Sequence, residues 1–498
     1  MADYCGRMSI LNFIYRPSLA LLSDLYQLTM AYGYWKTGPS DREAVFHLTF
    51  RRSPFHGGYT VAAGLATAID YLENSRFTGT DVAYLATLTG NDGGRLFEPA
   101  FLDFLRTLES ACDIDAVPEG TVVFPHEPLL RVRGPLLEAQ LLETALLNII
   151  NFQTLIATKA SRLVLAARGQ PVLEFGLRRA QGIDGALSAS RAAYIGGCDA
   201  TSNVLAGQLY GIPVRGTHAH SWVMCHDDEL TAFREYARVM PNNCVFLVDT
   251  YDTLQGVRHA VIVGQELRKQ GHEMIGIRLD SGDLASLSVD ARRILDEGGF
   301  PKASIVASND LDERIVETLK DQDAKIDIWG VGTRLVTGCD DPALGGVYKL
   351  SAVRRPGEAW QYKVKLSEQA AKVSTPGVLQ VRRFYSDDGI PLADAIIDEN
   401  AICEGRLTMV DPLDMTRRKT VPDGSTSEDL LVPVFRGGRR VYKVPDLESI
   451  RRRAAAQLAR FPVAIKRFVN PHEYFVGLER GLHERKTRLI LQERGFEH

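Results

Sequence analysis

The stretch MIGIRLDSGD at residues 274–283 shows the pattern on which the fold depends. A short apolar run ends in charged residues and glycine, and a helical pattern follows. The unit recurs at spacings of roughly 20–40 residues, which fits successive strand–helix units. The apolar runs are 172–175, 212–214, 245–248, 274–277, 304–306 and 326–329. Because nearly continuous apolar strands are buried on both faces, the region predicts a parallel sheet, either a barrel or an open doubly wound sheet.

The whole chain has 498 residues, which allows roughly two to four domains. Lys and Arg number 58 and Asp and Glu 62, so the net charge is 58 − 62 = −4. This balance gives no support to nucleic-acid binding, which normally needs a basic surface. The patterns divide the chain into an α/β segment at 1–135, a region at 136–350 that holds the repeated strand–helix units, and later strands with a C-terminal helical region at 351–498.

Cysteines and apolar runs indicate the cellular compartment. The seven cysteines are scattered and never spaced as CxxC, which argues against a disulfide scaffold or a cysteine-rich zinc module. The most apolar stretch, 136–152, is interrupted by Glu138, Gln140 and Glu143, so we expect no membrane span. Arg16 and Pro17 interrupt the mildly apolar N-terminus, which therefore does not resemble a signal peptide. We predict a soluble cytoplasmic protein.

Outside the repeated units, periodicity predicts further elements. Helices are expected at 23–35, with Ser23 or Asp24 as N-cap, and at 136–168 as one long or broken helix. A final helix should begin near Asp446 and bury Leu447, Ile450, Ala454 and Leu458. Strands are expected at 44–50, 120–124, 348–353, 360–366 and 378–385, and an exposed loop at 423–428. The arginine-rich stretch 436–453 is interpreted as a solvated surface, because no aromatic residues alternate with the arginines.

In parallel α/β folds, the chemistry lies at the carboxyl ends of the strands. Polar residues and glycines follow every apolar run of the repeat; they are Arg178, Arg179, Thr217, His218, His220, Ser221, Asp249, Asp252, Arg278, Asp280, Ser281, Asp283, Ser308, Asn309, Asp310, Gly330, Gly332 and Thr333. Asp249, Ser308 and Asp310 also suit helix N-caps, and Gly330 and Gly332 also suit a simple tight turn. Together these side chains would form a cleft.

That set of residues suits a phosphorylated substrate with a divalent metal. Arginine forks bind phosphate or carboxylate bidentately. The GVGT segment at 330–333 would present backbone N–H groups to a phosphate at a helix N-terminus. Asp280 and Asp283 could hold magnesium or bind ribose hydroxyls.

The HAH sequence allows three interpretations. If it is extended, His218 and His220 point to the same side. They could form a zinc pair, but only His226, His259 and His272 follow before residue 340 to complete such a site. The other two interpretations are a structural histidine at a strand end and a catalytic histidine beside the phosphate cleft.

Several long motifs resemble those of the nicotinate phosphoribosyltransferase family, which belongs to the type II phosphoribosyltransferases. They cover nearly the whole chain in the family's order and are SDLYQLTMAYGY at 23–34, EFGLRRAQG at 174–182, GGCDATSNVLAG at 196–207, GTHAHSWV at 216–223, LVDTYDT at 247–253, IRLDSGDL at 277–284, SNDLDE at 308–313, GVGTRLVT at 330–337, LGGVYKL at 344–350 and NPHEY at 470–474.

The resemblance implies an irregular β/α barrel flanked by a mixed α/β domain, with a C-terminal extension. It implies that nicotinate and phosphoribosyl pyrophosphate give nicotinate mononucleotide and pyrophosphate in NAD biosynthesis. ATP hydrolysis would be coupled through a phosphohistidine, with Mg²⁺ as cofactor. Relatives suggest a homodimer whose subunits share active sites.

Matching the motifs assigns expected roles to individual residues. His220 would be the phosphohistidine, and Tyr26, Phe175, Thr217 and Arg278 would bind nicotinate. Residues expected to bind the phosphoribosyl group are Arg178, Asp280, Asn309, Gly330, Gly332 and Thr333. The roles agree with simple chemistry, because aromatic rings stack on a pyridine ring and an arginine fork binds a carboxylate.

The sequence leaves alternatives open for the substrate and for the class of protein. Nicotinamide-specific relatives place an aspartate in the stretch matching 199–207, where the nearest matches here are the neutral Ser202 and Asn203, which favours nicotinate; Asp199 keeps the point open. The quinolinate-using relative is much shorter and fits less well. From other classes, a zinc-dependent barrel hydrolase and a pyridine-nucleotide sensor without turnover remain alternatives.

Overall fold

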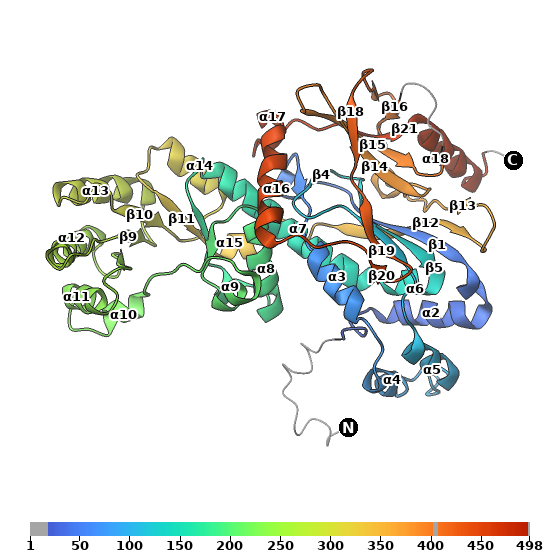
Figure 1. Cartoon of the computed structure of the whole chain (residues 1–498), viewed down its shortest axis with the longest axis horizontal. Coiled ribbons are helices and arrows are strands. Elements are labelled where there is room, and N and C mark those ends of the chain that lie inside the picture. The colour runs from blue at the N-terminus through green and yellow to red at the C-terminus, as the bar shows by residue number, and fades with distance from the viewer. Residues whose placement is uncertain (1–17, 402–406, 497–498) are drawn as a thin grey trace.

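The computed structural model describes residues 18–401 and 407–496, so Cys5, Arg16, Pro17 and Cys403 lie outside the described residues. Two lobes are joined through the long helix α7 (Glu143–Ala166). The parallel-sheet lobe holds the repeated units, and the flanking lobe holds two mainly antiparallel sheets (Figure 1). The predicted α/β architecture with a parallel sheet and a flanking domain is therefore confirmed.

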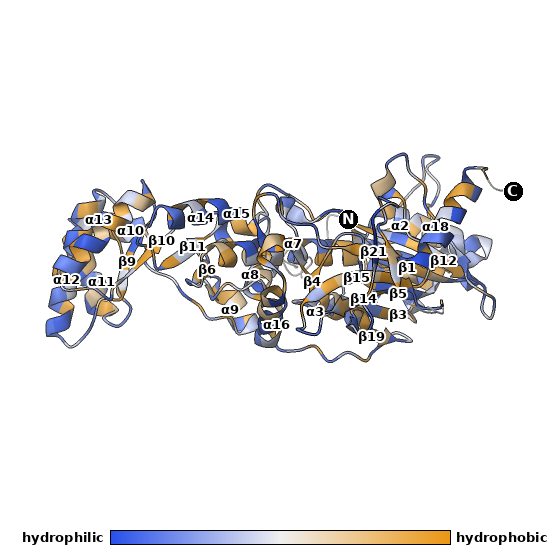
Figure 2. Ribbon diagram, turned by 90° about the horizontal axis from the view of Figure 1, so that it is seen from above, coloured by the Kyte–Doolittle hydropathy of each residue, from blue (hydrophilic) through white to orange (hydrophobic). Residues whose placement is uncertain are grey.

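The parallel sheet has the order β7-β6-β11-β10-β9-β8. Its strands are β6 (Val172–Glu174), β7 (Ala200–Thr201), β8 (Val245–Leu247), β9 (Gly276–Leu279), β10 (Ser304–Ala307) and β11 (Ile328–Val331). Every neighbouring pair is parallel, so the carboxyl ends of the strands lie at one edge. The strands are the apolar centre of this lobe (Figure 2).

Two features of the sheet correct the sequence predictions. The run at 212–214 is not a strand; it contributes one isolated bridge between Thr201 and Val214, beside the unpredicted β7. Proline at 213 has no N–H to donate, which limits ladder formation there. Strands β9 and β11 both begin two residues later than predicted. Arg278 and Gly330 consequently lie inside strands rather than after them.

Helices follow the strands, and aspartates cap four of them, α11 to α14. They are α8 (Ile183–Ile195), α9 (Val204–Tyr210), α10 (His220–Met224), α11 (Glu229–Val239), α12 (Thr253–Lys269), α13 (Leu284–Glu297), α14 (Glu313–Asp321) and α15 (Thr333–Val336). Asp252 and Asp312 cap α12 and α14 through backbone N–H groups. The helix-cap alternative for Asp249, Ser308 and Asp310 is therefore wrong, because these helices start later in the chain.

The first sheet of the flanking lobe takes strands from widely separated parts of the chain. Its order is β13-β12-β1-β5-β3-β19-β20. The strands are β1 (Glu43–Phe50), β3 (Asp113–Ala116), β5 (Pro128–Pro135), β12 (Gly346–Arg354), β13 (Gln361–Tyr362), β19 (Val432–Arg436) and β20 (Arg439–Arg440). Strand β12 crosses the boundary predicted at residue 350, and β13 is shorter than the strand predicted at 360–366.

The second flanking sheet has the order β17-β16-β21-β15-β14-β18. Its strands are β14 (Leu379–Tyr385), β15 (Pro391–Asp398), β16 (Thr408–Val410), β17 (Arg418–Thr420), β18 (Thr426–Asp429) and β21 (Val476–Glu479). The loop predicted at 423–428 is partly wrong, because β18 pairs with β14 as an exposed edge strand, which tolerates polar residues. A separate pair joins β2 (Thr60–Val61) to β4 (Val122–Val123).

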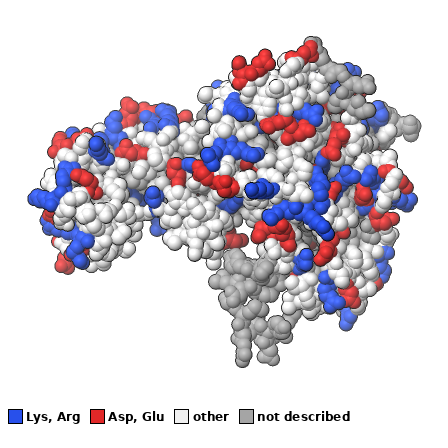
Figure 3. All heavy atoms as spheres, in the orientation of Figure 1, with Lys and Arg blue, Asp and Glu red and all other residues white. Residues whose placement is uncertain are grey.

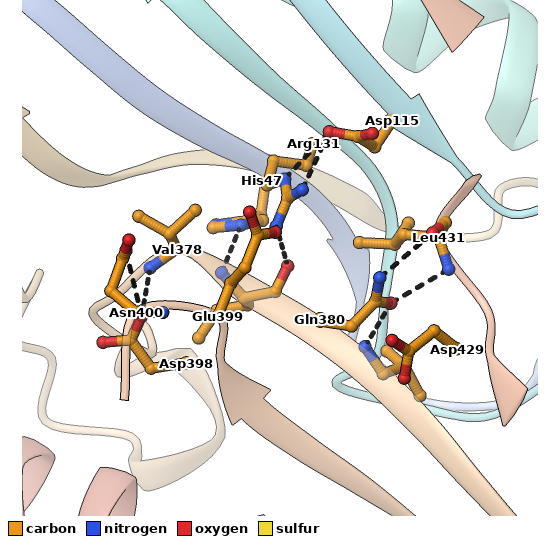
Figure 4. A network of polar contacts seen from close by, with 12 residues as sticks. His47, Asp115, Arg131, Val378, Gln380, Asp398, Glu399, Asn400, Asp429 and Leu431 are labelled. Atoms are coloured by element: carbon orange, nitrogen blue, oxygen red, sulfur yellow. Dashed lines mark hydrogen bonds and ion pairs between the residues drawn. The ribbon is translucent and has the colours of Figure 1, made fainter. Parts of the chain in front are cut away.

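Buried polar contacts attach β14 to the first flanking sheet (Figure 4). Arg131 on β5 donates to Asp115 and to the carbonyl oxygen of Leu379, and it forms an ion pair with Glu399. His47 Nε2 accepts from the Leu379 N–H at 3.1 Å. Burial, with the nearby charge of Arg131, holds the pKa of His47 well below its usual value, so the ring stays neutral.

The remaining helices pack around these sheets and are α2 (Leu25–Thr37), α3 (Leu65–Asn74), α4 (Gly79–Leu85), α5 (Pro99–Thr107), α6 (Leu136–Leu141), α16 (Leu447–Arg460), α17 (Val463–Lys466) and α18 (Arg480–Glu493). The helix predicted at 136–168 is broken at Leu142, between α6 and α7. Asp446 caps α16 as predicted, and Ile450, Ala454 and Leu458 are buried. It is not the final helix, because α17 and α18 follow.

The surface carries mixed charge. On the face seen in Figure 3, basic and acidic side chains are interspersed rather than gathered into one basic field. Several arginines of the 436–453 stretch have acidic partners, among them Arg436 with Asp115 and Arg451 with Asp199. Within residues 18–401 and 407–496, no helix has the length and apolar character needed to cross a membrane.

Candidate functional site

Arg278 is the centre of a polar cluster at the carboxyl edge of the parallel sheet. Its Nε–H donates to Ser308 Oγ at 2.8 Å, one terminal nitrogen donates to Asp280 Oδ1 at 2.9 Å, and the other donates to Thr217 Oγ1 at 3.3 Å. The side chain is 15% exposed. Three neighbours therefore fix the guanidinium, and two of its five N–H groups remain for a ligand.

Ser308 ties Arg278 to its counter-ion. Its hydroxyl accepts from Arg278 and donates to Asp280 Oδ1. Burial alone would raise the pKa of Asp280, but the hydrogen bond from Ser308 and the charge of Arg278 outweigh burial and hold that pKa below its usual value. Asp280 therefore stays ionised near neutral pH.

An aromatic ring covers the other side of the guanidinium. Arg278 Cζ lies 5.6 Å from the centre of the Phe175 ring, which follows β6. Gly330 leaves room for the ring, since a Cβ there would lie 2.8 Å from two of its carbons. At Gly332, an added Cβ would lie 3.1 Å from the carbonyl oxygen of Phe175. In this structure both glycines accommodate Phe175, a role that the turn or phosphate interpretations did not include.

His220, the first residue of α10, lies at the rim of this cluster. Its Nδ1 is 3.1 Å from Thr250 Oγ1, and its Nε2 is 3.8 Å from Asp280 Oδ2. The side chain is 40% exposed. A ligand in the cleft could therefore reach Nε2 while Thr250 holds the opposite side of the ring.

His218 faces a different environment. It is buried against Tyr236 and Phe246, and its Nε2 accepts from the Leu247 N–H at 3.3 Å. Burial lowers the pKa of His218 to about 4. The ring therefore acts as a neutral structural acceptor at the end of β8. His218 and His220 do not share one site, so the zinc-pair interpretation of HAH is wrong.

Two carboxylates could hold magnesium at this edge. Asp249 Oδ2 accepts from the Asp280 N–H and from Ser281 Oγ, whereas its Oδ1 is buried and has no hydrogen-bond partner in the described structure. Magnesium is commonly held by one or two carboxylates together with water and substrate phosphates. Asp249 and Asp280 fit that pattern. Asp283, predicted as the second ligand, instead accepts from the backbone of Ala285 and caps α13.

The other predicted phosphate-binding residues surround the cleft less tightly. Arg178 is exposed in the short 3₁₀ helix Leu177–Arg179, which follows Phe175. Asn309 has a φ of 125° and accepts from the Asp310 N–H through Oδ1. Thr333 is the first residue of α15. Their positions leave them open to a ligand, but within the described residues no side-chain hydrogen bond or ion pair joins them to Arg278, although Asn309 directly follows Ser308 in the chain.

The stretch expected to sense an amide carries no free carboxylate near the cluster. Asn203 caps α9 and is buried against Ser190, and Ser202 donates its backbone N–H to the Glu174 carbonyl. Asp199 instead accepts from the Val172 N–H and from Arg451.

Tyr26 lies elsewhere. It sits on α2 in the flanking lobe, 47% exposed, and Figure 1 shows α2 and β9 in different lobes. Within one chain, Tyr26 and Arg278 are therefore not brought together.

A basic pocket opens in the same flanking lobe. Its positive charge comes from Arg51, Lys349 and Lys372, the neutral His47 and His126 also line it, and none of its lining residues is acidic. Sequence reasoning missed this pocket, because its residues come from β1, β12, β14 and the segments between strands, without a shared motif. It also missed Thr250 as the partner of His220.

The fold and the cluster together define a class: an α/β protein whose parallel sheet offers arginine, histidine and carboxylates to a small charged ligand. Three family models match successive parts of the chain. They are the nicotinate phosphoribosyltransferase N-terminal domain at residues 21–151, the nicotinate phosphoribosyltransferase family at 171–379, and the nicotinate phosphoribosyltransferase C-terminal domain at 379–486.

Individual relatives agree. A nicotinate phosphoribosyltransferase from Bacillus subtilis (strain 168) is 44% identical over 484 residues, covering 95% of this chain and 97% of the relative. The protein of that name from Homo sapiens is 36% identical, with coverage of 93% and 95%. The crystal structure of human nicotinic acid phosphoribosyltransferase has a TM-score of 0.82 at 33% identity and covers 94% of this chain and 99% of that one. The chain belongs to the nicotinate phosphoribosyltransferase family of enzymes.

Proposed function

We propose that this chain transfers a phosphoribosyl group from phosphoribosyl pyrophosphate to nicotinate, releasing nicotinate mononucleotide and pyrophosphate. The observation that carries the proposal is the Arg278 guanidinium, held by Thr217, Asp280 and Ser308 beside the Phe175 ring. A cation next to an aromatic face suits a flat pyridine ring that bears a carboxylate.

The same edge suits the charges of the reaction. Bond cleavage at the anomeric carbon builds positive charge on the ribose and negative charge on the departing pyrophosphate. Exposed Arg178 and the junction between β11 and α15, at Gly332 and Thr333, would contact phosphates. Asp249 and Asp280 would hold magnesium, which would help neutralise the pyrophosphate.

ATP would act through His220. With Nδ1 hydrogen-bonded to Thr250, Nε2 is the nitrogen left to attack a γ-phosphate. The product would be phosphohistidine and ADP, and later hydrolysis would release inorganic phosphate. A phosphoryl group beside Asp280 adds negative charge at the rim of the cleft, which would favour bound magnesium and couple ATP to substrate affinity.

A homodimer would complete the site. Tyr26 is exposed, and the basic pocket with Arg51, Lys349 and Lys372 lies in the flanking lobe, whereas the Arg278 cluster lies in the parallel-sheet lobe. A partner could supply both features: an aromatic ring to cover nicotinate and a cationic wall for phosphates. The subunits would then share two equivalent active sites.

The deciding experiment incubates the purified protein with nicotinate, phosphoribosyl pyrophosphate, magnesium and ATP, and assays nicotinate mononucleotide. We expect product formation with ATP consumed, and much less product when nicotinamide replaces nicotinate. Tight binding of nicotinate mononucleotide without turnover would instead establish a sensor.

A further inference from the structure

A second group of arginines lines a pocket at the outer part of the first flanking sheet. Arg42, Arg354 and Arg355 form its walls together with Val353, Glu358 and Gln361. Three segments meet there. Arg42 directly precedes β1, the consecutive Arg354 and Arg355 lie at the end of β12, and Gln361 begins β13. Pairing of Glu43 on β1 with Arg354 on β12 fixes these segments side by side.

The positive charge of this pocket is only partly neutralised. Arg354 forms an ion pair with Glu43, Nη2 to Oε2 at 2.6 Å, and its Cζ lies 4.3 Å from the centre of the Trp360 ring. Among the described residues, Arg42 and Arg355 have no carboxylate oxygen within ion-pair distance of the guanidinium. Glu358 contributes the acidic side chain of the described lining. Three neighbouring guanidinium groups repel one another unless an anion lies between them.

The pocket has the size and chemistry for such an anion. Its volume of about 160 Å³ corresponds to roughly five water molecules. Planar guanidinium forks recognise phosphate oxygens bidentately, and several forks around one cavity select ligands with more than one negative charge. We propose that this pocket binds a phosphate-bearing anion, either free pyrophosphate or the phosphate end of a nucleotide. The proposal is independent of the phosphoribosyltransferase activity.

Trp360 supplies a local reporter. Its ring centre lies 4.3 Å from Arg354 Cζ and 5.5 Å from Arg133 Cζ. An anion that binds Arg354 and Arg355 would alter the charge around the indole and therefore its fluorescence. Because the chain has four tryptophans, the signal must be assigned with Trp360→Phe.

The test titrates the full-length protein with pyrophosphate, inorganic phosphate or ATP at constant ionic strength, while tryptophan fluorescence is recorded. We expect a saturable change with pyrophosphate that Trp360→Phe removes. In the double variant Arg42→Ala/Arg355→Ala, the half-saturating concentration should rise at least about tenfold, as expected when charged hydrogen bonds are lost. Arg293→Ala, which removes an exposed arginine of α13, should leave the titration unchanged.

Comparing the titrations with different anions distinguishes free pyrophosphate from a nucleotide as the ligand. Similar responses to pyrophosphate and ATP would assign recognition to the linked phosphates, whereas a response to ATP alone would assign the site to a nucleotide. Arg42→Lys/Arg355→Lys keeps the charges without the forks and should give intermediate binding. The proposal is overturned if no anion gives a saturable Trp360 signal at millimolar concentration. It is also overturned if chloride at equal ionic strength gives the same response, or if the folded double-alanine variant binds like the wild type.

Discussion

The Arg278 cluster and the flanking-lobe surface around Tyr26 differ in how their side chains are held. Arg278 is 15% exposed and has three hydrogen-bond partners, so its position is fixed within one chain. Tyr26 is 47% exposed, and the basic pocket of the same lobe has no acidic lining residue. The side chains of the first region are preorganised by contacts within one chain. The second region has an exposed aromatic ring and uncompensated positive charge, as expected of a surface that binds a ligand or a partner.

The largest effect is expected at His220. His220→Ala should abolish phosphoryl transfer from ATP, because no other imidazole in residues 18–401 and 407–496 contacts Thr250 or Asp280. Phosphoribosyl transfer should survive at a reduced rate, since the anomeric chemistry does not use the phosphohistidine. Acid-labile, base-stable labelling from γ-labelled ATP, followed by peptide mapping, measures this. Label that persists in His220→Ala, or that maps to His218, would break the assignment.

Each lobe also contains a neutral histidine, buried His218 in one and half-buried His126 in the other, that should make folding sensitive to acid. Burial lowers the pKa of both His218 and His126 to about 4, below the unfolded value of about 6.5. The unfolded chain therefore binds more protons below pH 6.5, and stability falls as the pH drops from about 6.5 to 4. Each histidine should lower the free energy of unfolding by up to about 3 kcal/mol over this pH range.

Denaturant unfolding at several pH values measures the loss. His218→Gln keeps an acceptor for the Leu247 N–H and should flatten the pH dependence. His126→Gln should do the same through the flanking lobe, which compares the two lobes directly. An unchanged slope in both variants would show that other groups set the acid sensitivity.

Arg278→Ala tests the preorganised region. Loss of a charged hydrogen bond to the nicotinate carboxylate should cost about 1.5–3 kcal/mol, or roughly 10–150-fold in kcat/KM for nicotinate. Arg278→Lys should recover only part of this, because an ammonium lacks the planar fork. Steady-state kinetics on folded protein measures both. Nicotinate kinetics equal to the wild type would remove Arg278 from carboxylate binding.

In the flanking lobe, Tyr26→Ala should lower kcat/KM for nicotinate by a smaller factor than Arg278→Ala does. Loss of an aromatic stack costs about 0.5–1.5 kcal/mol, or roughly 2–13-fold in kcat/KM. Tyr26→Phe keeps the ring and serves as the matched control, with kinetics close to the wild type. Equal losses in both variants would assign the effect to the hydroxyl rather than to stacking.

How far the sequence predicts the structure depends on how local each feature is. Arg278, Asp280 and Thr217 could be chosen because polar residues after apolar runs meet at one edge of a parallel sheet. The bridging role of Ser308 could not, since it depends on the register that sets Arg278 opposite Val306, and periodicity carries no register. For the same reason, β9 and β11 begin two residues later than the sequence predicted.

The flanking lobe was harder to predict. Its first sheet pairs β1 with β5 and β12, which are separated from it by long stretches of chain. No local sequence pattern predicts such a pairing. Tyr26 stood out only through a resemblance, because its helix is otherwise an ordinary packed segment. The basic pocket depends wholly on that long-range assembly.

The most direct test of the shared-site account mixes two variants. Arg278→Ala lacks the preorganised half, and a variant with Tyr26→Ala, Lys349→Ala and Lys372→Ala lacks the flanking half. We expect each to be severely impaired alone, since each homodimer would contain two incomplete sites. After subunit exchange, verified by mass spectrometry, mixed dimers should regain one intact site and up to half of the wild-type activity per mixed dimer. No recovery despite verified exchange would contradict a site built from two subunits.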